Sequence, residues 1–428
     1  MMNNSQENKF KIIEDADIIV GIDIAKNTHW ATIINTNGRI LMKSFYFNNT
    51  INGFKCLVSN IEKVLIMING NKAIVGMEPT GHYWKALAKY LIKKENIKVV
   101  TVNPYHVKKS KELDDNSQTK NDKKDCLTIA RIVKDARFFE PYIPEGIWEE
   151  LRITTVARQE LVKRENALKN KIIRIEDEYF PEYTKVFKKI LSKTSYIILK
   201  TCPFVSDILE KGIEGLQKEI RKEMKQGYRK QQLIDIYEAA KISVGMIENI
   251  QAVKEQMKIY MEESELIIKQ KERIEKRLEE LLKQTGYYES ITSIKGIGIV
   301  SAAMFLGEVG EIKRFSCYEQ IRRFAGLNLV ENSSGIHKGV TKISKRGRAG
   351  LRSILYLMAC NMVSKNNEIK ELYKYLTTRK ENPLKKKQAL IAVEGKIIQI
   401  IYTLAIKNKR YEAARVFSQE RIEQLKAA

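Results

Sequence analysis

The chain has 428 residues, which is longer than one hydrophobic core usually supports, so two or three domains are expected. Lysine and arginine total 76 against 52 acidic residues, a formal charge of +24 that favours a polyanionic partner, DNA, RNA or both. The first residues lack the apolar stretch of a signal peptide, and we identify neither an amphipathic anchor nor a long apolar run. A cytoplasmic protein without membrane contact is therefore expected.

The sulfur and imidazole side chains do not form metal-binding patterns. The five cysteines are scattered and never spaced C-x-x-C, and the four histidines form no H-x-x-x-H pair. Neither a disulfide framework nor a zinc site is indicated. Any metal is expected to be held by oxygen.

Residues 1–137 alternate predicted strands and helices. The first three strands form a meander, because Asn37-Gly38 is a hairpin turn signal between apolar segments. The predicted strands are 18–24, 29–34, 39–47, 73–77 and 97–102, and the predicted helices are 51–68, 82–92 and a further one after residue 102. This order, β-β-β-α-β-α-β-α, is that of an RNase H-like α/β domain.

After residue 137 nearly every segment is predicted to be helical, and residues 138–289 form the first helical region. Its end carries a heptad seam of ten positions, eight of them apolar: Ile250, Val253, Met257, Tyr260, Ser264, Ile267, Lys271, Ile274, Leu278 and Leu281. This pattern favours a coiled coil, through which the chain would form a dimer or tetramer. An antiparallel helical hairpin within one chain is the alternative.

A third, mostly helical unit spans residues 290–408, and a charged tail, 409–428, follows it. The predicted fold class is therefore α/β in the first domain and all-α in the remainder.

Four carboxylates in the first domain stand where strands end or a helix begins. Asp23 closes the first strand in VGIDIA, and Glu78 closes the fourth in VGMEPTG. Asp122 and Asp125 lie three apart at the start of a predicted helix, on one face. Such a cluster repels itself without a cation, and Mg²⁺ prefers carboxylate oxygen. Two ions about 4 Å apart would support phosphodiester cleavage.

Each of these acids has a simpler interpretation as a turn or helix-cap residue, and their joint placement is what favours a metal site. An actin-like or sugar-kinase ATPase also begins with a strand carrying Gly-Ile-Asp. Such proteins need glycine-rich phosphate loops, whereas Asp23 is followed by Ile24-Ala25-Lys26-Asn27. The sequence therefore favours nuclease chemistry.

Two segments of the third unit carry residues suited to phosphate. The turn at Lys295-Gly296-Ile297-Gly298 is typical of a helix-hairpin-helix element or of an ordinary glycine-rich connection. Further on, Ser333, Ser334 and Gly335 precede a basic stretch, so a serine there would face phosphate as a nucleophile or as a turn residue. The basic residues of that stretch are Lys338, Lys342, Lys345, Arg346, Arg348 and Arg352.

These motifs resemble those of DEDD-type insertion-sequence transposases, which pair a RuvC-like N-terminal domain with a C-terminal transposase domain. The acids in GID, MEPTG and NDKKD match the quartet of the first domain, and IKGIGIVSA, RRFAGLNL, SSG and KISKRGRAGLR match the second domain. The resemblance implies that Asp23, Glu78, Asp122 and Asp125 bind Mg²⁺, or Mn²⁺ in its place. It also implies a serine nucleophile, for which Ser334 is the best match and Ser333 the competitor.

The resemblance further implies an oligomer joined through the helical middle and a nucleoid-associated protein that acts on donor and target DNA. In that family a structured noncoding guide RNA, the bridge RNA, selects both DNA molecules. Two features depart from the pattern: Asn328-Leu329 replaces the usual threonine-proline, and residues 138–250 form a longer region than expected.

The leading hypothesis is therefore an RNA-guided DNA transposase or recombinase with a serine nucleophile. The nearest alternative is a hydrolytic nuclease, such as a Holliday-junction resolvase, in which only the carboxylates perform chemistry. A non-enzymatic nucleoid or RNA-binding protein would explain the charge but not the acids at the strand ends.

Overall fold

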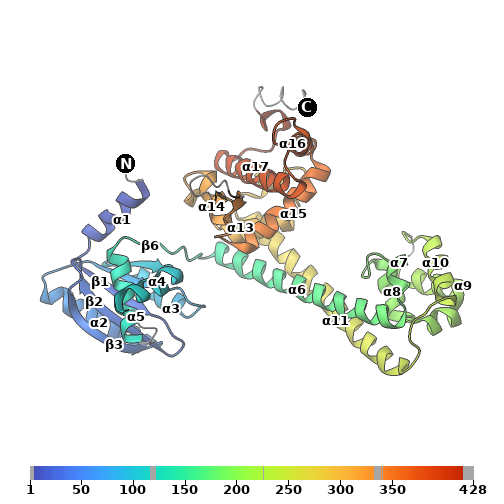
Figure 1. Cartoon of the computed structure of the whole chain (residues 1–428), viewed down its shortest axis with the longest axis horizontal. Helices are drawn as coiled ribbons and strands as arrows, with labels where there is room; N and C mark the ends of the chain where they lie inside the picture. Colours follow the sequence, from blue (N-terminus) through green and yellow to red (C-terminus); the bar gives the residue numbers. More distant parts are fainter. Residues whose placement is uncertain (1–3, 116–121, 225, 332–338, 340, 418–428) are drawn as a thin grey trace. The chain divides into compact units, whose positions relative to one another are not determined.

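The computed structural model describes residues 4–115, 122–224, 226–331, 339 and 341–417. The chain divides into two compact units, residues 1–143 and 144–428 (Figure 1). The first unit extends past the predicted boundary at residue 137, because a short strand there pairs with the sheet. Each unit has its own hydrophobic cores and is described separately.

The first unit is built on one six-stranded sheet of order β3-β2-β1-β4-β5-β6. The first three strands form the predicted antiparallel meander, β4 and β5 run parallel to β1, and β6 is antiparallel to β5. The strands are β1 (Ile18–Asp23), β2 (Thr28–Asn35), β3 (Ile40–Asn48), β4 (Ala73–Met77), β5 (Ile97–Val102) and β6 (Phe138–Phe139). The predicted order of strands is confirmed, and among the strands of this sheet the two-residue β6 was not foreseen.

Helices cover both faces of this sheet. The unit contains α1 (Asn4–Glu14), α2 (Ile51–Met67), α3 (Trp84–Ile92), α4 (Pro104–Asp115) and α5 (Asp122–Lys134). Because strand side chains alternate between faces, Ile18, Val20 and Ile22 pack with α2 and α3, while Ile19 packs in the second core with α5. The polar helix α1 was not predicted.

The second unit begins with two long helices, α6 (Ile147–Tyr179) and α11 (Ile250–Gln284), which pack against each other (Figure 1). Their ion pairs show that the helices are antiparallel, because Glu150 contacts Arg277 whereas the later Glu165 contacts the earlier Lys271. All ten positions of the heptad seam are buried or half-buried. Helix α6 of the same chain packs along α11, as in the intrachain hairpin that the sequence left as the alternative.

Residues 180–249 connect the two long helices and form what we call the distal lobe. It contains α7 (Tyr183–Val186), α8 (Lys193–Thr201), α9 (Val205–Glu223) and α10 (Lys230–Lys241). Its core is completed by the last turns of α6 and the first turns of α11, including Ile172, Ile175 and Met257. The lobe is thus a small helical body at one end of the hairpin.

The other end of the hairpin shares a core with the C-terminal lobe, residues 285–417. Leu151 of α6 and Leu278 of α11 pack in that core with apolar residues of the later helices. The lobe contains α12 (Tyr288–Thr292), α13 (Ile299–Val309), η1 (Ile312–Arg314), α14 (Tyr318–Ala325), β7 (Leu329–Val330), β8 (Lys342–Ile343), α15 (Ala349–Lys365), α16 (Asn367–Thr378), α17 (Lys386–Lys407) and η2 (Ala413–Arg415). The expected helical character after the first domain is confirmed.

One helix within the described part of the chain, α17, is long and apolar enough to cross a membrane by length and composition alone. This corrects the expectation that no long apolar run is present. In the structure Val393, Ile397 and Ile401 of α17 lie in the core of the C-terminal lobe. The apolar composition of α17 is accounted for by this packing.

Candidate active site

Two of the candidate acids lie side by side at one edge of the sheet. Strands β1 and β4 are parallel neighbours whose last paired residues are Ile22 and Met77. The next residue on each strand is Asp23 and Glu78, so their backbones are about 4.8 Å apart. Both acids are half-buried. The register therefore brings together two carboxylates that are 55 positions apart in the sequence.

Two glycines show which face of the sheet carries these acids. Gly21 and Gly76 face each other across β1 and β4, and each stands two residues before an acid. A Cβ atom on Gly21 would lie 2.0 Å from the Cys126 carbonyl oxygen of α5, and one on Gly76 would lie 2.4 Å from Val133 Cγ2. Residues two apart share a face of a strand. Asp23 and Glu78 are therefore on the face that α5 covers.

The start of α5 lies near the Asp23 end of β1. The Cys126 thiol donates to Ser44 Oγ at 3.5 Å, which joins the first turns of α5 to β3. Burial raises the pKa of this thiol, and the nearby Asp23 carboxylate adds to the shift. Asp125 immediately precedes Cys126 and is half-buried. Asp122 is the first residue of α5, and its side chain lies outside the described residues.

The loop after Asp23 is fixed by two side chains that sequence reasoning missed. His29 is fully buried, and its Nδ1 accepts a hydrogen bond from the Ala25 backbone at 3.2 Å. Burial lowers the pKa of His29, which keeps the ring neutral and able to accept. Asn49 donates to the Lys26 carbonyl at 3.1 Å. The only sequence signal for this role was the closeness of His29 to Asp23.

Glu78 is oriented by its own turn. Thr80 Oγ1 donates to Glu78 Oε1 at 3.1 Å, and the Thr80 backbone donates to the Glu78 carbonyl at 2.8 Å. Gly81 closes the turn with φ of +60°, a value that favours glycine. The MEPTG motif thus holds one carboxylate oxygen and leaves the other available for a ligand.

The donor chemistry of this edge fits a hard divalent cation. Asp23, Glu78 and Asp125 offer only carboxylate oxygens, which Mg²⁺ and Mn²⁺ prefer. Among the side chains that the structure describes, which exclude that of Asp122, no group of three or more histidine, cysteine, aspartate or glutamate residues gathers as a metal cluster. The observed arrangement is thus an adjacent pair of acids beneath a helix that carries two more.

The C-terminal lobe holds a second candidate region, whose base is tightly joined. Backbone hydrogen bonds of 2.8 to 3.0 Å join two segments, 324–328 (FAGLN) and 344–352 (SKRGRAGLR). For example, Ser344 donates to the Asn328 carbonyl and Lys345 donates to the Gly326 carbonyl. A Cβ atom on Gly347 would lie 2.5 Å from the Gly326 nitrogen. Strands β7 and β8 extend from this base as an antiparallel pair.

The expected serine nucleophile belongs to the segment between β7 and β8. Ser333, Ser334 and Lys338 lie outside the described residues. The described residues on either side of that segment form the joined base. It is built by the same two motifs, FAGL and SKRGRAGLR, that carried the resemblance in the sequence.

The candidate DNA-binding cations differ in their surroundings. Lys295, Lys342, Lys345 and Arg346 are exposed, as a phosphate contact requires. By contrast, Arg352 donates to the Ala325 carbonyl at 2.9 Å and secures the hairpin base.

Arg348 is likewise engaged inside the lobe. Its guanidinium lies 3.7 Å from the buried Glu308, which also accepts a hydrogen bond from Arg152 at 2.5 Å. Burial lowers the pKa of Arg348. Arg348 and Arg352, two of the cations expected to bind nucleic acid, are thus half-buried and also make contacts within the protein.

The turn at Lys295 packs as a helix connection. Gly296 has φ of +101°, and a Cβ atom there would lie 3.0 Å from Met362 Cα of α15. Asn366 donates to the Lys295 carbonyl at 3.3 Å. Helix α12, before the turn, has only five residues. These contacts account for Gly296 through packing, whereas a Cβ atom on Gly298 would meet no atom within 4 Å. The exposed Lys295 side chain is the group of this turn that could contact a phosphate.

Comparison with known proteins gives two matches that cover both candidate regions. A profile described as a transposase, of the DEDD type of the IS110 group, matches residues 20–181. A second profile, described as the transposase IS116/IS110/IS902 family, matches residues 288–374. The first contains the strand-end acids with α5, and the second contains the hairpin base.

Two curated relatives agree with these matches. The chain is 22% identical over 406 residues to the uncharacterized 44.8 kDa protein of insertion element IS116 from Streptomyces clavuligerus, covering 92% of this chain and 95% of that protein. It is 29% identical over 141 residues to the transposase for insertion sequence element IS1111A from Coxiella burnetii, covering 32% of this chain and 38% of that protein. These findings define the class of the protein as an enzyme that cleaves and rejoins DNA. The chain carries the two domains of DEDD-type insertion-sequence transposases of the IS110/IS116 family.

Proposed function

We propose that the chain moves DNA by metal-dependent strand cleavage and exchange, with Ser334 as the nucleophile. The observation that carries this proposal is the pairing of Asp23 with Glu78 at the ends of adjacent parallel strands, beneath the helix that carries Asp122 and Asp125. The sheet order, a meander followed by two parallel strands, supports an RNase H-like, RuvC-like first domain. DNA is the substrate class, as donor and as target.

In this proposal Asp23, Glu78, Asp122 and Asp125 hold Mg²⁺, or Mn²⁺ in its place. Bound there, the ion would lower the pKa of the attacking hydroxyl and stabilise charge on the leaving oxygen. Thr80 and His29 orient the site indirectly, because Thr80 binds Glu78 and His29 fixes the loop after Asp23. The acids would otherwise repel one another, and this repulsion is the drive for binding a cation.

Ser334 would attack a DNA phosphorus and form a phosphoserine bond while a strand oxygen leaves with a proton. Because that covalent bond conserves the phosphodiester energy, a second strand end can reverse the step and be joined in its place. The exposed Lys342, Lys345 and Arg346 at the base of the hairpin would hold neighbouring phosphates. Ser333 is the alternative nucleophile.

The choice of DNA by a structured noncoding guide RNA is part of the same proposal, as is assembly into a homo-oligomer. The support for both is the resemblance of the motifs at the two ends of the chain. Since the heptad seam faces α6 of the same chain, the oligomer would use a different surface.

A hydrolytic nuclease is the second candidate, because the strand-end acids could cleave DNA without a serine. The distinguishing experiment incubates the full chain with element-junction DNA, its associated RNA and Mg²⁺, followed by denaturation. We expect DNA covalently bound to the wild-type protein, and none on Ser334→Ala, which should still bind both nucleic acids. Asp23→Ala should also form no adduct.

Ser333→Ala is the matched control and should keep the adduct. An adduct that persists in Ser334→Ala and disappears in Ser333→Ala would move the nucleophile by one residue. Free nicked DNA from Ser334→Ala at the wild-type rate would contradict the serine mechanism and favour the hydrolytic nuclease.

A further inference from the structure

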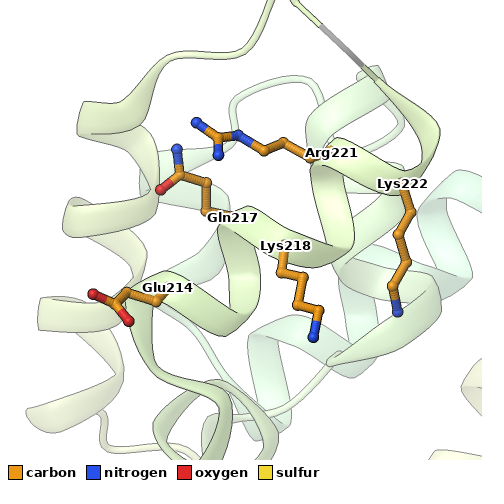
Figure 2. A pocket seen from close by; sticks show the side chains of 5 residues that line it. All are labelled: Glu214, Gln217, Lys218, Arg221 and Lys222. Carbon is orange, nitrogen blue, oxygen red and sulfur yellow. The ribbon is translucent and has the colours of Figure 1, made fainter.

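The distal lobe carries a basic hollow on the outer face of α9. The hollow has a volume of about 530 Å³ and is lined by Glu214, Gln217, Lys218, Arg221 and Lys222 (Figure 2). Three of these five side chains are cations and one is an acid. All three cations are exposed. Neither candidate active-site region includes this surface.

Arg221 is held in place with its terminal donors unused. Its Nε donates to the Tyr228 hydroxyl at 3.2 Å, and Gln217 donates to the same oxygen at 2.8 Å. These two donors lower the pKa of Tyr228. In Figure 2 the Arg221 side chain extends toward Gln217. Among the described residues, the terminal guanidinium nitrogens have no acidic partner, so they remain available for a bidentate contact with two phosphate oxygens.

The nearby acids do not neutralise the hollow. Glu219 is bonded by both Lys211 and Lys222 at 2.8 Å, and these bonds lower its pKa to about 2. Lys218 has no ion pair with any residue that the structure describes. Two more exposed cations, Arg229 and Lys230, follow on the turn into α10. The surface therefore keeps an excess of positive charge after its internal pairs are counted.

We propose that this hollow binds the phosphodiester backbone of nucleic acid, with the duplex DNA of the transposase as the occupant. Several exposed cations around one fixed arginine fork fit a chain of phosphates better than a single small anion. The proposal deepens the proposed function, because it names a contact of the DNA outside the reacting centre.

The distal lobe lies far enough along α6 from the C-terminal lobe for a phosphate contact there to lengthen the bound DNA. Leu151 lies in the core shared with the C-terminal lobe, and Ile172 lies in the core of the distal lobe. Both belong to the continuous helix α6. At about 1.5 Å per residue they are roughly 30 Å apart, close to one turn of duplex DNA. A backbone contact here would extend the bound DNA by about one helical turn without reading its sequence.

The test measures binding rather than strand exchange. The full chain carrying Ser334→Ala is titrated in EDTA with labelled duplex DNA and, separately, with a structured RNA, over about 50 to 200 mM salt. The triple variant Lys218→Gln, Arg221→Gln, Lys222→Gln should lower the slope of log affinity against log salt by about two to three units. A loss with DNA is expected, and a loss with RNA alone would overturn the proposal that duplex DNA is the occupant.

The matched control removes the same charge from the same unit at cations that do not line the hollow: Lys200→Gln, Lys241→Gln and Lys269→Gln. It should leave the slope within about one unit of the parent protein. The proposal is overturned if the first triple keeps the parent slope on both nucleic acids, or if the control loses as much. Thermal unfolding of each variant shows whether the distal lobe remains folded. Since no strand is cut in this assay, its result is independent of the Ser334 mechanism.

Discussion

At the scale of single residues, the geometry of the candidate site depends on two glycines as much as on the acids. Gly21 and Gly76 lack side chains at the two places where α5 touches the sheet. Each stands two positions before a strand-end acid, so the same strand face carries the close approach and the carboxylate. The pattern Val-Gly-x-acid occurs in both strands. Its glycine allows α5 to pack closely on the sheet, and its acid lies on the same face as that helix.

Replacing Gly21 with alanine should displace α5. The new Cβ would meet backbone atoms of Cys126 and Ala130 at 2.0 and 2.5 Å, and backbone cannot move aside as a flexible side chain can. We expect a loss of about 1–3 kcal/mol in unfolding free energy and loss of strand cleavage. Gly298→Ala, where no atom lies within 4 Å of the added Cβ, is the control. Equal activity of Gly21→Ala and the control would contradict the role of the close contact.

A buried acid in the C-terminal lobe gives a second prediction. Glu394 of α17 is 3% exposed, and burial raises its pKa from 4.5 to about 7 although Arg352 opposes the shift. Below pH 4.5 the carboxyl is neutral in both states, and above that value the unfolded chain releases the proton first. The contribution of Glu394 to stability therefore falls as pH rises from 4.5 and is lost above about 7.

Glu394→Gln should remove this part of the pH dependence. The difference in unfolding free energy between wild type and variant should change by about 3 kcal/mol between acidic and mildly alkaline buffer. Chemical denaturation on both sides of the transition measures it. The exposed Glu371→Gln on α16 serves as the control and should follow the wild type. A variant that tracks the wild type at every pH would show that Glu394 does not titrate in this range.

At the scale of elements, α11 shows how a heptad seam can be used within one chain. Helix α6 packs along α11, and ion pairs of the hairpin join Glu165 to Lys271 and Arg158 to Glu275. At one end the seam enters the distal lobe, and at the other it enters the C-terminal lobe. The hairpin is thus the common support of both lobes.

Ile267→Ala tests the intrachain pairing. The side chain is 2% exposed in the core at the distal end of the hairpin, so truncation should cost about 2–5 kcal/mol. Because the partner helix is in the same chain, the drop in melting temperature should not vary with protein concentration. Leu266→Ala, one residue earlier and 55% exposed, is the control. A drop that shrinks as concentration rises would instead indicate pairing between chains.

At the scale of the whole molecule, the two candidate regions lie in different units of the chain. The first holds the strand-end acids over its own two cores. The second presents the FAGL and SKRGRAGLR hairpin base at one end of the long helices and the basic hollow at the other. Part of the formal charge of +24 therefore gathers on exposed surfaces. Other cations, such as Arg348 and Arg352, contact groups within the protein.

The sequence by itself determined the five longer strands of the first unit and the position of Asp23 and Glu78 at strand ends. Both follow from short apolar runs that stop at an acid. It did not foresee α1, which is polar, or β6, which is too short for a pattern.

Only the tertiary structure decided which surface fills the seam of α11, which arginines face the interior, and why Gly21 and Gly76 are needed. Each of these depends on contacts between residues far apart in the chain, such as Lys271 with Glu165 or Arg348 with Glu308. A heptad pattern is the same whether its partner lies in one chain or in two, and a basic residue has the same letter whether it faces phosphate or a buried carboxylate. Local sequence patterns therefore indicate which contacts a residue is able to make, and the tertiary packing determines which of these contacts forms.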